Sequence, residues 1–451
     1  MRKFVYPALT IIPLCLTCGC GLYSKYERQP MEFDTAQLCA DDTVGTPLSA
    51  LSWRELFTDS FLREWIDSGL KSNTDLRIAQ YKINEAAATL SASRLAILPS
   101  LSLDADGSAG TNSESRFNIG PSAKWELDIF GKQRNLRLGA EASFYASQSY
   151  RQAVQTSLVA AIADGYYTLL MLDEQLSISE RTLKTWDENI RVLQALKRAG
   201  RANEAGVLQA RANRLKVEAS VLTLRNQIEE QENSIKSLLL DPSADLKRGK
   251  LNEQEFPEAI ESGITLKCLS NRPDVMEAEF RLQKSFYDIN VARAAFHPSV
   301  TLSGNAGWMT YTGNIANPSA WIANAIGSLA MPLFNRGTNK ANLEIARNEY
   351  EIASLEFQQK LVDAGLEVNN AISSWQTAKD RLNLDKKQIV ALQGAVHNTR
   401  LLMRNTDTTN YLEVLTAQQR LLEAELSEAA DRYNAIQAVI TLYHALGGGV
   451  V

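Results

Sequence analysis

A long apolar stripe runs along the last part of the chain. Apolar residues recur there at every seventh position: Leu415, Leu422, Ala429, Ile436 and Tyr443. Three more fall at the interleaved offset of four residues: Leu426, Tyr433 and Ile440. This heptad spacing predicts a helix that packs along its length against other helices, in the manner of a coiled coil.

The same helix occurs twice. Residues 207–239 align with residues 414–446 at a constant offset of 207 residues, and 8 of the 33 aligned positions are identical. The first copy carries Leu208, Leu215 and Leu222, with Ala219, in the equivalent apolar places, so we expect this seam to be packed as well. A chain that builds one long helix twice has a duplicated architecture, and its function is to be sought in what two such halves can enclose.

Between the helical segments the pattern changes to a period of two. From Phe117 to Ile129 apolar and polar residues alternate, which predicts a strand with one apolar and one hydrophilic face. A shorter alternation begins at Leu101, so we predict a β-hairpin over about 100–130, and a second over about 299–334. Residues 75–103 align with residues 274–302, with 7 of 29 positions identical, and this places the two hairpins at equivalent points of a repeat.

Each half is therefore predicted as a helix, a hairpin, a long helix, a turn and a second long helix. The first repeat covers residues 53–250, with its long helices over 132–240. The second covers residues 251–449, with its long helices over 338–447. The predicted strands, roughly 9–13 residues each, are long enough for tilted membrane-spanning strands. Three tryptophans near the strand ends are candidate membrane-interface residues: Trp125, Trp308 and Trp321.

The fold class that follows is mostly α, with membrane β-barrel strands. Four strands cannot close a barrel, and open strand edges are not tolerated in lipid. We therefore predict that identical chains complete it, three of them giving a twelve-stranded barrel continuous with a cylinder of long helices. The alternative is a soluble helical protein with two half-exposed hairpins, and the repetition of the hairpins together with an export signal argues against it.

The N-terminus carries that export signal. Residues 1–19 begin with Arg2 and Lys3 and continue with a mostly apolar segment, which is typical of a secretory signal peptide. The ending at Cys20 resembles the lipobox of bacterial lipoproteins, so we predict that this cysteine is lipidated and that residues 20–52 form an anchored arm. An ordinary signal peptide with incidental cysteines is the alternative. Cys39 and Cys268 remain afterwards, and the sequence leaves open whether they are paired or free.

Composition excludes several other classes of function. The net charge is only -5, which indicates neither a nucleic-acid-binding surface nor an acidic tail. The three histidines lie far apart in the sequence, so we predict no metal site. We find no glycine-rich phosphate loop and no nucleophile motif, and we therefore expect no cofactor and no enzymatic activity.

Several segments resemble the TolC-like outer-membrane factors of bacterial tripartite efflux pumps, in particular their OprM-type lipoprotein branch. These segments are Trp53–Phe57 (WRELF), Asn73–Ala79 (NTDLRIA), Trp125–Asn135 (WELDIFGKQRN), Asn271–Glu279 (NRPDVMEAE), Ala292–Pro298 (ARAAFHP), Asn410–Gln418 (NYLEVLTAQ) and Leu442–Gly449 (LYHALGGG). The resemblance covers nearly the whole mature chain, and the order of the motifs is more specific than any one of them.

The resemblance implies a homotrimer in the outer membrane, lipid-anchored and lying mostly in the periplasm. It implies an exit duct without enzymatic activity. Its partners would be a periplasmic adaptor protein, an inner-membrane transporter of the RND type and the outer-membrane lipid, with no nucleic acid. The duct would pass small molecules, and neither the substrate nor the particular pump follows from the sequence. Protein secretion through a type I system is the alternative within this class, and a periplasmic coiled-coil scaffold lipoprotein is a more distant one.

The resemblance also suggests functional positions at the two helical turns. The adaptor would contact the tips at Gly200, Asn203, Glu204, Asn405 and Asn410. Family members commonly narrow the pore near the tips with a ring of acidic residues, and Asp407 is the matching position, flanked by Arg404 and Thr408. Three Asp407 carboxylates facing one another would favour cations at the aperture. The chain departs from the family pattern at Arg404, at Asn405 and at Gly206.

Overall fold

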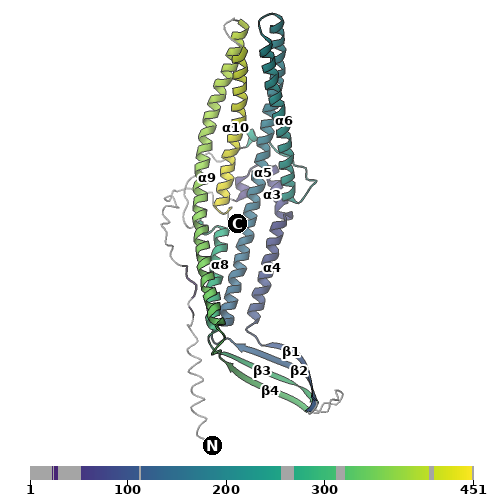
Figure 1. The fold of residues 1–451 in the computed structure, drawn as a ribbon, viewed down its shortest axis with the longest axis vertical. Helices are drawn as coiled ribbons and strands as arrows, with labels where there is room; N and C mark the ends of the chain where they lie inside the picture. Colours follow the sequence, from purple (N-terminus) through teal and green to yellow (C-terminus); the bar gives the residue numbers. More distant parts are fainter. Residues whose placement is uncertain are drawn as a thin grey trace. The chain divides into compact units, whose positions relative to one another are not determined.

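The helices and strands occur in the predicted order, twice. The computed structural model describes residues 23, 25–28, 52–110, 113–254, 269–310, 320–405 and 411–448. Its first series of elements is α2 (Trp53–Leu56), α3 (Ser60–Ser72), α4 (Thr74–Leu95), β1 (Ser100–Gly110), β2 (Ser113–Leu127), α5 (Lys132–Arg198) and α6 (Glu204–Leu239). The second series is a short 3₁₀ turn (Leu251–Glu253), α8 (Pro273–Ala294), β3 (Ser299–Thr310), β4 (Ala320–Ala330), α9 (Thr338–Asn405) and α10 (Tyr411–Ala445). Figure 1 shows these elements.

The chain forms two compact units, and each unit takes segments from both sequence repeats. Unit 1 contains the sheet with residues 79–151 and 274–360 and the described part of the N-terminal arm. Unit 2 contains residues 52–78, 152–254, 269–273 and 361–448 among those described. Equivalent halves of the repeat therefore pack with one another instead of folding separately. The division of the sequence into two repeats remains a prediction about its internal homology.

The four strands of unit 1 form one antiparallel sheet in the order β1-β2-β3-β4. The register places apolar residues opposite one another: Ala123 pairs with Leu101 and with Gly304, and Leu302 pairs with Trp125. Polar residues are also placed opposite one another: Ser122 pairs with Ser102 and with Asn305. Since side chains alternate between faces, β1, β2 and β3 share one apolar and one hydrophilic face, and β4 adds Asn324 but also Ile326 to the hydrophilic side.

Two glycines permit the close approach of the two hairpins. A Cβ atom on Gly120 would lie 2.1 Å from the carbonyl oxygen of Ala306, and one on Gly307 would lie 2.4 Å from that of Ile119. Pro121 follows in β2 and has no N–H group to donate to β3, and it has no ladder partner on that strand. The glycines therefore allow β2 and β3 to meet where their ladder is interrupted.

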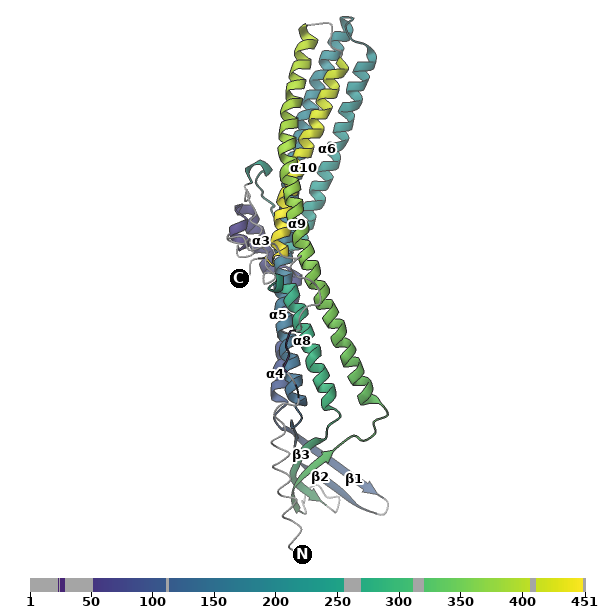
Figure 2. The same cartoon turned by 90° about the vertical axis from the view of Figure 1, so that its left-hand side faces the viewer.

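Long antiparallel helices form the core of unit 2. α9 and α10 run side by side, as do α5 and α6 (Figures 1 and 2). Aromatic residues from α5, α10 and the segment after α2 lie at the centre of the largest apolar cluster, among them Tyr166, Tyr443 and Phe57. A second cluster nearer the α5–α6 turn joins Trp186 and Leu193 to Val207 and to Leu415 of α10. These contacts hold α5, α6 and α10 together as a bundle.

The prediction that both heptad seams are packed is wrong for the first copy within a single chain. In α10 the seam residues Leu415, Ala429, Ile436 and Tyr443 are buried. In α6 the equivalent leucines, Leu208, Leu215 and Leu222, are exposed, the last by 64%. α6 packs instead through a neighbouring stripe of smaller side chains, which contains Val207, Ala210, Val217, Val221 and Leu224.

The segment after α6 packs within unit 2. Leu246 and Leu251 are buried in the core of unit 2. Arg248 contacts the carboxylates of Asp173 and Glu232 at 2.6 and 2.7 Å. Residues 255–268, which include Cys268, lie outside the described residues, as does Cys39. Among the helices that the structure describes, none is both long enough and apolar enough to cross a membrane.

Candidate functional site

The hydrophilic face of the sheet is hollowed. A depression of about 320 Å³ lies over β1, β2 and β3. Its charged and amide-bearing lining residues are Asp104, Asp106, Asn118, Lys124 and Asn305. A surface of this composition stays hydrated, as does the inner wall of a water-filled channel.

The predicted tryptophans lie at opposite ends of the strands. Trp125 lies seven residues before the start of α5 at Lys132, and its indole N–H donates to the carbonyl of Ile97 at 2.8 Å. Trp308 pairs in register with Trp321 near the far end of the sheet, beside the β3–β4 connection. The indoles of Trp125 and Trp308 are both partly exposed. This placement at two ends fits two aromatic belts, and the membrane-interface role remains a prediction.

Part of the N-terminal arm is docked on unit 1. Arg28 makes two hydrogen bonds to the carboxylate of Glu279 in α8, one of them at 2.8 Å, and lies 5.3 Å from the ring centre of Phe357. The Tyr23 ring lies against Gly131, where a Cβ atom would be 3.5 Å away. Cys20 itself lies outside the described residues. The described part of the arm therefore contacts the junction between β2 and α5.

The α5–α6 turn brings together three of the predicted tip residues. Gly200 has a φ of +76°, a left-handed conformation that glycine adopts without strain. Asn203 caps α6 by accepting a hydrogen bond from the N–H of Gly206 at 2.9 Å. Glu204 forms an ion pair with Lys197, and this hydrogen bond lowers the pKa of its carboxyl. The turn is therefore a well-capped, polar surface.

The opposite turn lies largely outside the described residues. α9 continues to Asn405, so Arg404 and Asn405 end that helix. Asp407, Thr408 and Asn410 fall within 406–410, which the structure does not describe. Their roles at an aperture and at an adaptor-binding tip remain predictions.

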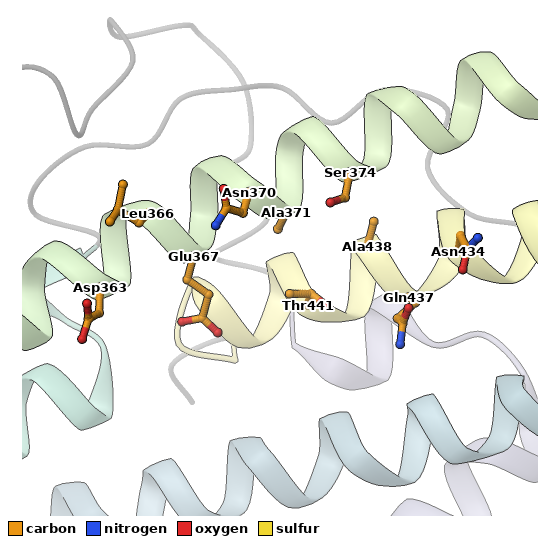
Figure 3. A pocket seen from close by; sticks show the side chains of 10 residues that line it. All are labelled: Asp363, Leu366, Glu367, Asn370, Ala371, Ser374, Asn434, Gln437, Ala438 and Thr441. Carbon is orange, nitrogen blue, oxygen red and sulfur yellow. The ribbon is translucent and has the colours of Figure 1, made fainter.

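A second polar hollow, of about 510 Å³, lies between α9 and α10 (Figure 3). Its polar lining residues are Asp363, Glu367, Asn370, Ser374, Asn434, Gln437 and Thr441. Figure 3 shows these side chains rising from two adjacent helices. These positions carry no signal in the sequence, because polar residues along a helix are usually just solvated.

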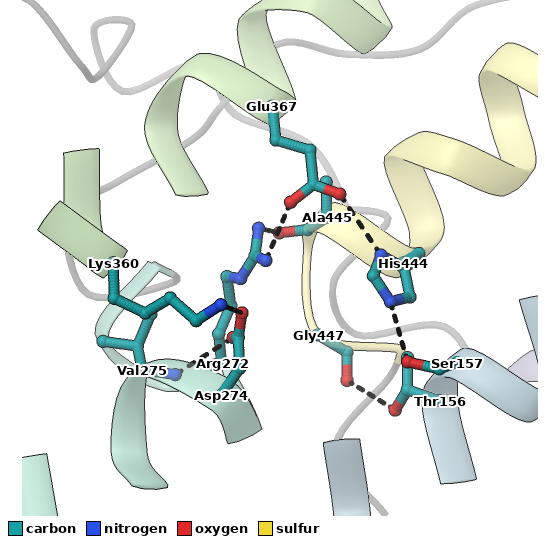
Figure 4. A network of polar contacts seen from close by, with 10 residues as sticks. All are labelled: Thr156, Ser157, Arg272, Asp274, Val275, Lys360, Glu367, His444, Ala445 and Gly447. Atoms are coloured by element: carbon teal, nitrogen blue, oxygen red, sulfur yellow. Dashed lines mark hydrogen bonds and ion pairs between the residues drawn. The ribbon is translucent and has the colours of Figure 1, made fainter. Parts of the chain in front are cut away.

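A polar network fastens the end of α10 within unit 2 (Figure 4). Arg272, almost fully buried, donates to the carbonyl of Ala445 at 2.6 Å and contacts Glu367 at 2.8 Å. His444 contacts Glu367 at 3.3 Å through Nδ1 and Ser157 at 3.2 Å through Nε2. The hydrogen bonds from His444 and then Arg272 lower the pKa of Glu367 to about 2. No sequence signal predicted it, because these residues are up to 287 positions apart.

The Ser157–His444–Glu367 chain resembles the proton relay of a serine hydrolase only in its atom types. Ser157 lies in the middle of α5, a continuous helix from Lys132 to Arg198 whose backbone N–H groups are already bonded. It therefore has no pair of free N–H groups beside it to stabilise an oxyanion. Within the described ranges, no cluster of three or more His, Cys, Asp or Glu side chains is arranged to hold a metal.

Comparison with known proteins decides the class. The model of the outer membrane efflux protein family matches residues 65–239 and 266–448. The chain belongs to this outer membrane efflux protein family. It is 28% identical over 455 residues to the cation efflux system protein CusC of Escherichia coli strain K12, with 97% of this chain and 99% of that protein covered.

Two further comparisons agree with this assignment. The chain is 27% identical to the probable outer membrane lipoprotein SilC of Salmonella typhimurium, over 99% of this chain and all of that protein. The open state of the MtrE outer membrane channel of Neisseria gonorrhoeae superposes with a TM-score of 0.86, at 27% identity, over 95% of this chain and 98% of that one.

Family membership confirms the main predictions from sequence. The chain is an outer-membrane component of an efflux pump and has the fold of the TolC-like channels. Related proteins in this family are channels, not enzymes. Its location is the outer membrane, and the lipoprotein name of SilC is consistent with a lipid anchor.

Proposed function

We propose that three copies of this chain close into one channel, a twelve-stranded barrel continuous with a helical duct, that carries small molecules out of the cell. A periplasmic adaptor would join it to an inner-membrane transporter of the RND type. The observation that carries this proposal is the four-stranded sheet, in which β1, β2 and β3 share one apolar and one hydrophilic face.

The sheet edges support closure by further copies. In the order β1-β2-β3-β4, β1 and β4 each have one side without a partner strand. In lipid an unpaired row of backbone groups is too costly to persist. The β4 edge of one copy would therefore pair with the β1 edge of the next, so that the apolar faces meet lipid and the hydrophilic faces line the lumen.

Exposed apolar side chains on the outer helices support the same assembly. α6 exposes Leu208, Leu215 and Leu222, and within unit 2 α9 exposes Leu366, Leu384 and Val390. Such stripes on long helices are typical of helix–helix interfaces. We propose that α6 of one copy packs near α9 of the next, which would complete a cylinder.

The partners would act at the helical tips. The polar α5–α6 turn, with Gly200, Asn203 and Glu204, would contact the adaptor together with Asn405 and Asn410. The aperture would be narrowed by Asp407, with Arg404 and Thr408 beside it. Three carboxylates at one constriction would attract cations and repel anions. The substrate would be chosen by the transporter; the name of the relative CusC refers to cations.

The docked arm supports lipid attachment at Cys20. Tyr23 lies against Gly131 at the junction of sheet and helix, and the three residues that separate it from Cys20 in the sequence can span about 10 Å at most. The acyl chains would therefore enter the bilayer close to the barrel edge. The Cys20→Ala variant tests this: we expect weaker membrane association with normal folding, whereas unchanged lipid labelling would contradict attachment at this residue.

Conductance in planar lipid bilayers tests the channel itself. Purified protein should insert and give ion currents, with cations carrying most of the current. In Asp407→Asn the preference for cations should weaken, while Asp380→Asn, an exposed carboxylate on α9, serves as the control. The absence of any current from membrane-inserted protein would contradict the proposal.

A further inference from the structure

Two aspartates face each other inside the α9–α10 pair. Asp385 of α9 is 9% exposed and Asp431 of α10 is 2% exposed. Both lie 23 residues from position 408 in the connection, so the antiparallel helices hold them at the same level. Arg381, one helical turn before Asp385 on the same face of α9, contacts Asp431 of α10, so the two aspartates belong to one contact between the helices. Buried carboxylates side by side repel strongly unless a positive charge or a proton compensates them.

Only part of this charge is compensated by neighbours. Arg381 contacts Asp431 through Nε at 3.0 Å and through the guanidinium end at 2.9 Å. Asn434 donates to the other oxygen of Asp431 at 3.3 Å. By contrast, Oδ2 of Asp385 is enclosed and has no hydrogen-bond partner. One guanidinium therefore faces two carboxyl groups, and one of these oxygens needs a hydrogen atom.

The other charged groups nearby do not supply this hydrogen atom. On α10, Glu428 adds negative charge and is paired with Arg432 at 3.1 Å. Arg181 and Glu174 of α5 influence the pKa of Glu425, which precedes Asp431 in α10. The next residues of α9, Lys386 and Lys387, are exposed. Burial first, and then the hydrogen bond with Asp431, raise the pKa of Asp385 to about 6.

We propose that Asp385 and Asp431 hold one proton between them and form a pH-responsive latch between α9 and α10. In the protonated pair, one carboxylic O–H donates to the neighbouring carboxylate, and Arg381 balances the remaining charge. When that proton leaves, a second negative charge stays buried without a partner, and the helices separate more readily.

The direction in which folding shifts the pKa of Asp385 determines how the stability of the α9–α10 pair changes with pH. A carboxyl whose pKa is raised by folding stabilises the folded form at low pH, and the stabilisation is lost as the pH rises through about 6. The α9–α10 pair is therefore held more firmly in mildly acidic solution than in mildly alkaline solution. The latch is independent of what the channel carries.

Hydrogen–deuterium exchange of the full-length, detergent-extracted protein tests the latch. In peptides covering 378–390 and 424–436, corrected for intrinsic rates, protection should be roughly tenfold greater at about pH 5 than at about pH 8. Asp385→Asn, whose amide replaces the carboxylic O–H as donor, should be protected at both pH values. Asp380→Asn, an exposed carboxylate on the same helix, should keep the pH dependence.

A second variant guards against misfolding of the first. Asp431→Asn removes the neighbouring carboxylate but leaves Asp385 buried, so the pH dependence should weaken and move to lower pH. Equal protection of the unmodified protein at both pH values would overturn the proposal. A pH dependence that persists in Asp385→Asn, or that is unchanged in Asp431→Asn, would overturn it as well.

Discussion

Leu208 and Leu415 occupy the same place in two copies of one helix, and their surroundings differ completely. Leu208 in α6 is 54% exposed, whereas Leu415 in α10 is 2% exposed. Both follow a buried valine, Val207 and Val414. The heptad pattern is thus retained in both copies, although only α10 buries it within the chain.

The difference shows that one sequence pattern can serve folding in one copy and assembly in the other. α10 lies between α9 and α5 and uses its seam for the core of the bundle. α6 contributes Val207, Ala210 and Val217 to that core and leaves its leucines outside. An apolar stripe of this kind is stable in water only when a partner covers it.

Replacing the exposed seam should have the largest effect, and on assembly. The triple variant Leu208→Gln, Leu215→Gln and Leu222→Gln removes about 1.5 kcal/mol or more of apolar burial per leucine at each interface. We expect folded helical monomers in detergent where the unmodified protein forms trimers. Ser220→Gln with Thr223→Gln, both exposed on α6, is the matched control. A triple variant that remains fully trimeric would remove α6 from the interface.

The matched pair of alanine variants should separate folding from assembly. Leu415→Ala creates a cavity in the bundle and should lower the free energy of unfolding by about 3 kcal/mol. Leu208→Ala should lower the stability of the monomer by well under 1 kcal/mol, because half of the side chain is in water already. Thermal unfolding and the fraction of trimer in detergent, both measured for each variant, compare them. Equal losses would mean that the two seams do not differ.

The C-terminal ends of α6 and α10 should also differ in how their contribution to stability depends on pH. His444 of α10 is bound to Glu367, whereas its counterpart in α6, Ser237, is exposed. Because folding lowers the pKa of Glu367 to about 2, its stabilising contribution is present at neutral pH and lost as the pH falls from about 4.5 to 2. After allowance for partial solvent screening, Glu367→Gln should cost about 1 kcal/mol at pH 7.

Acid unfolding curves check this prediction. Between pH 7 and pH 2, the unmodified protein should lose the advantage that it has over Glu367→Gln at neutral pH. A difference that stays constant with pH would show that the charge of Glu367 is not involved.

The smallest effect on stability is expected for the arginine that occurs at equivalent positions of α6 and α10. Arg225 of α6 pairs with Glu180 at 2.8 Å in an exposed position, and Arg432 of α10 pairs with Glu428 at 3.1 Å in a more buried one. Arg225→Ala should cost less than about 0.5 kcal/mol, and less still in high salt. Arg432→Ala should cost about 1 kcal/mol, part of it from lost packing. Urea unfolding at two salt concentrations measures both, and a larger cost at Arg225 would reverse the comparison.

The order of elements was predictable because each carries a local signal. Pro99 and Pro298 end helices α4 and α8, and strict alternation marks β2. The buried polar contacts were not predictable, because Asp385 and Asp431 look like solvated helix residues until the turn brings them together. The exposed seam of α6 was misjudged for a related reason: periodicity shows that a face is apolar, and the covering partner can belong to another chain.

The mass of the detergent-extracted protein, measured by light scattering with the detergent contribution subtracted, tests the central claim most directly. We expect a polypeptide mass of about three mature chains for the unmodified protein and of one chain for the α6 leucine triple variant. A mature protein that is a stable monomer in water without detergent would contradict closure of the sheet by three chains, and with it the channel described here.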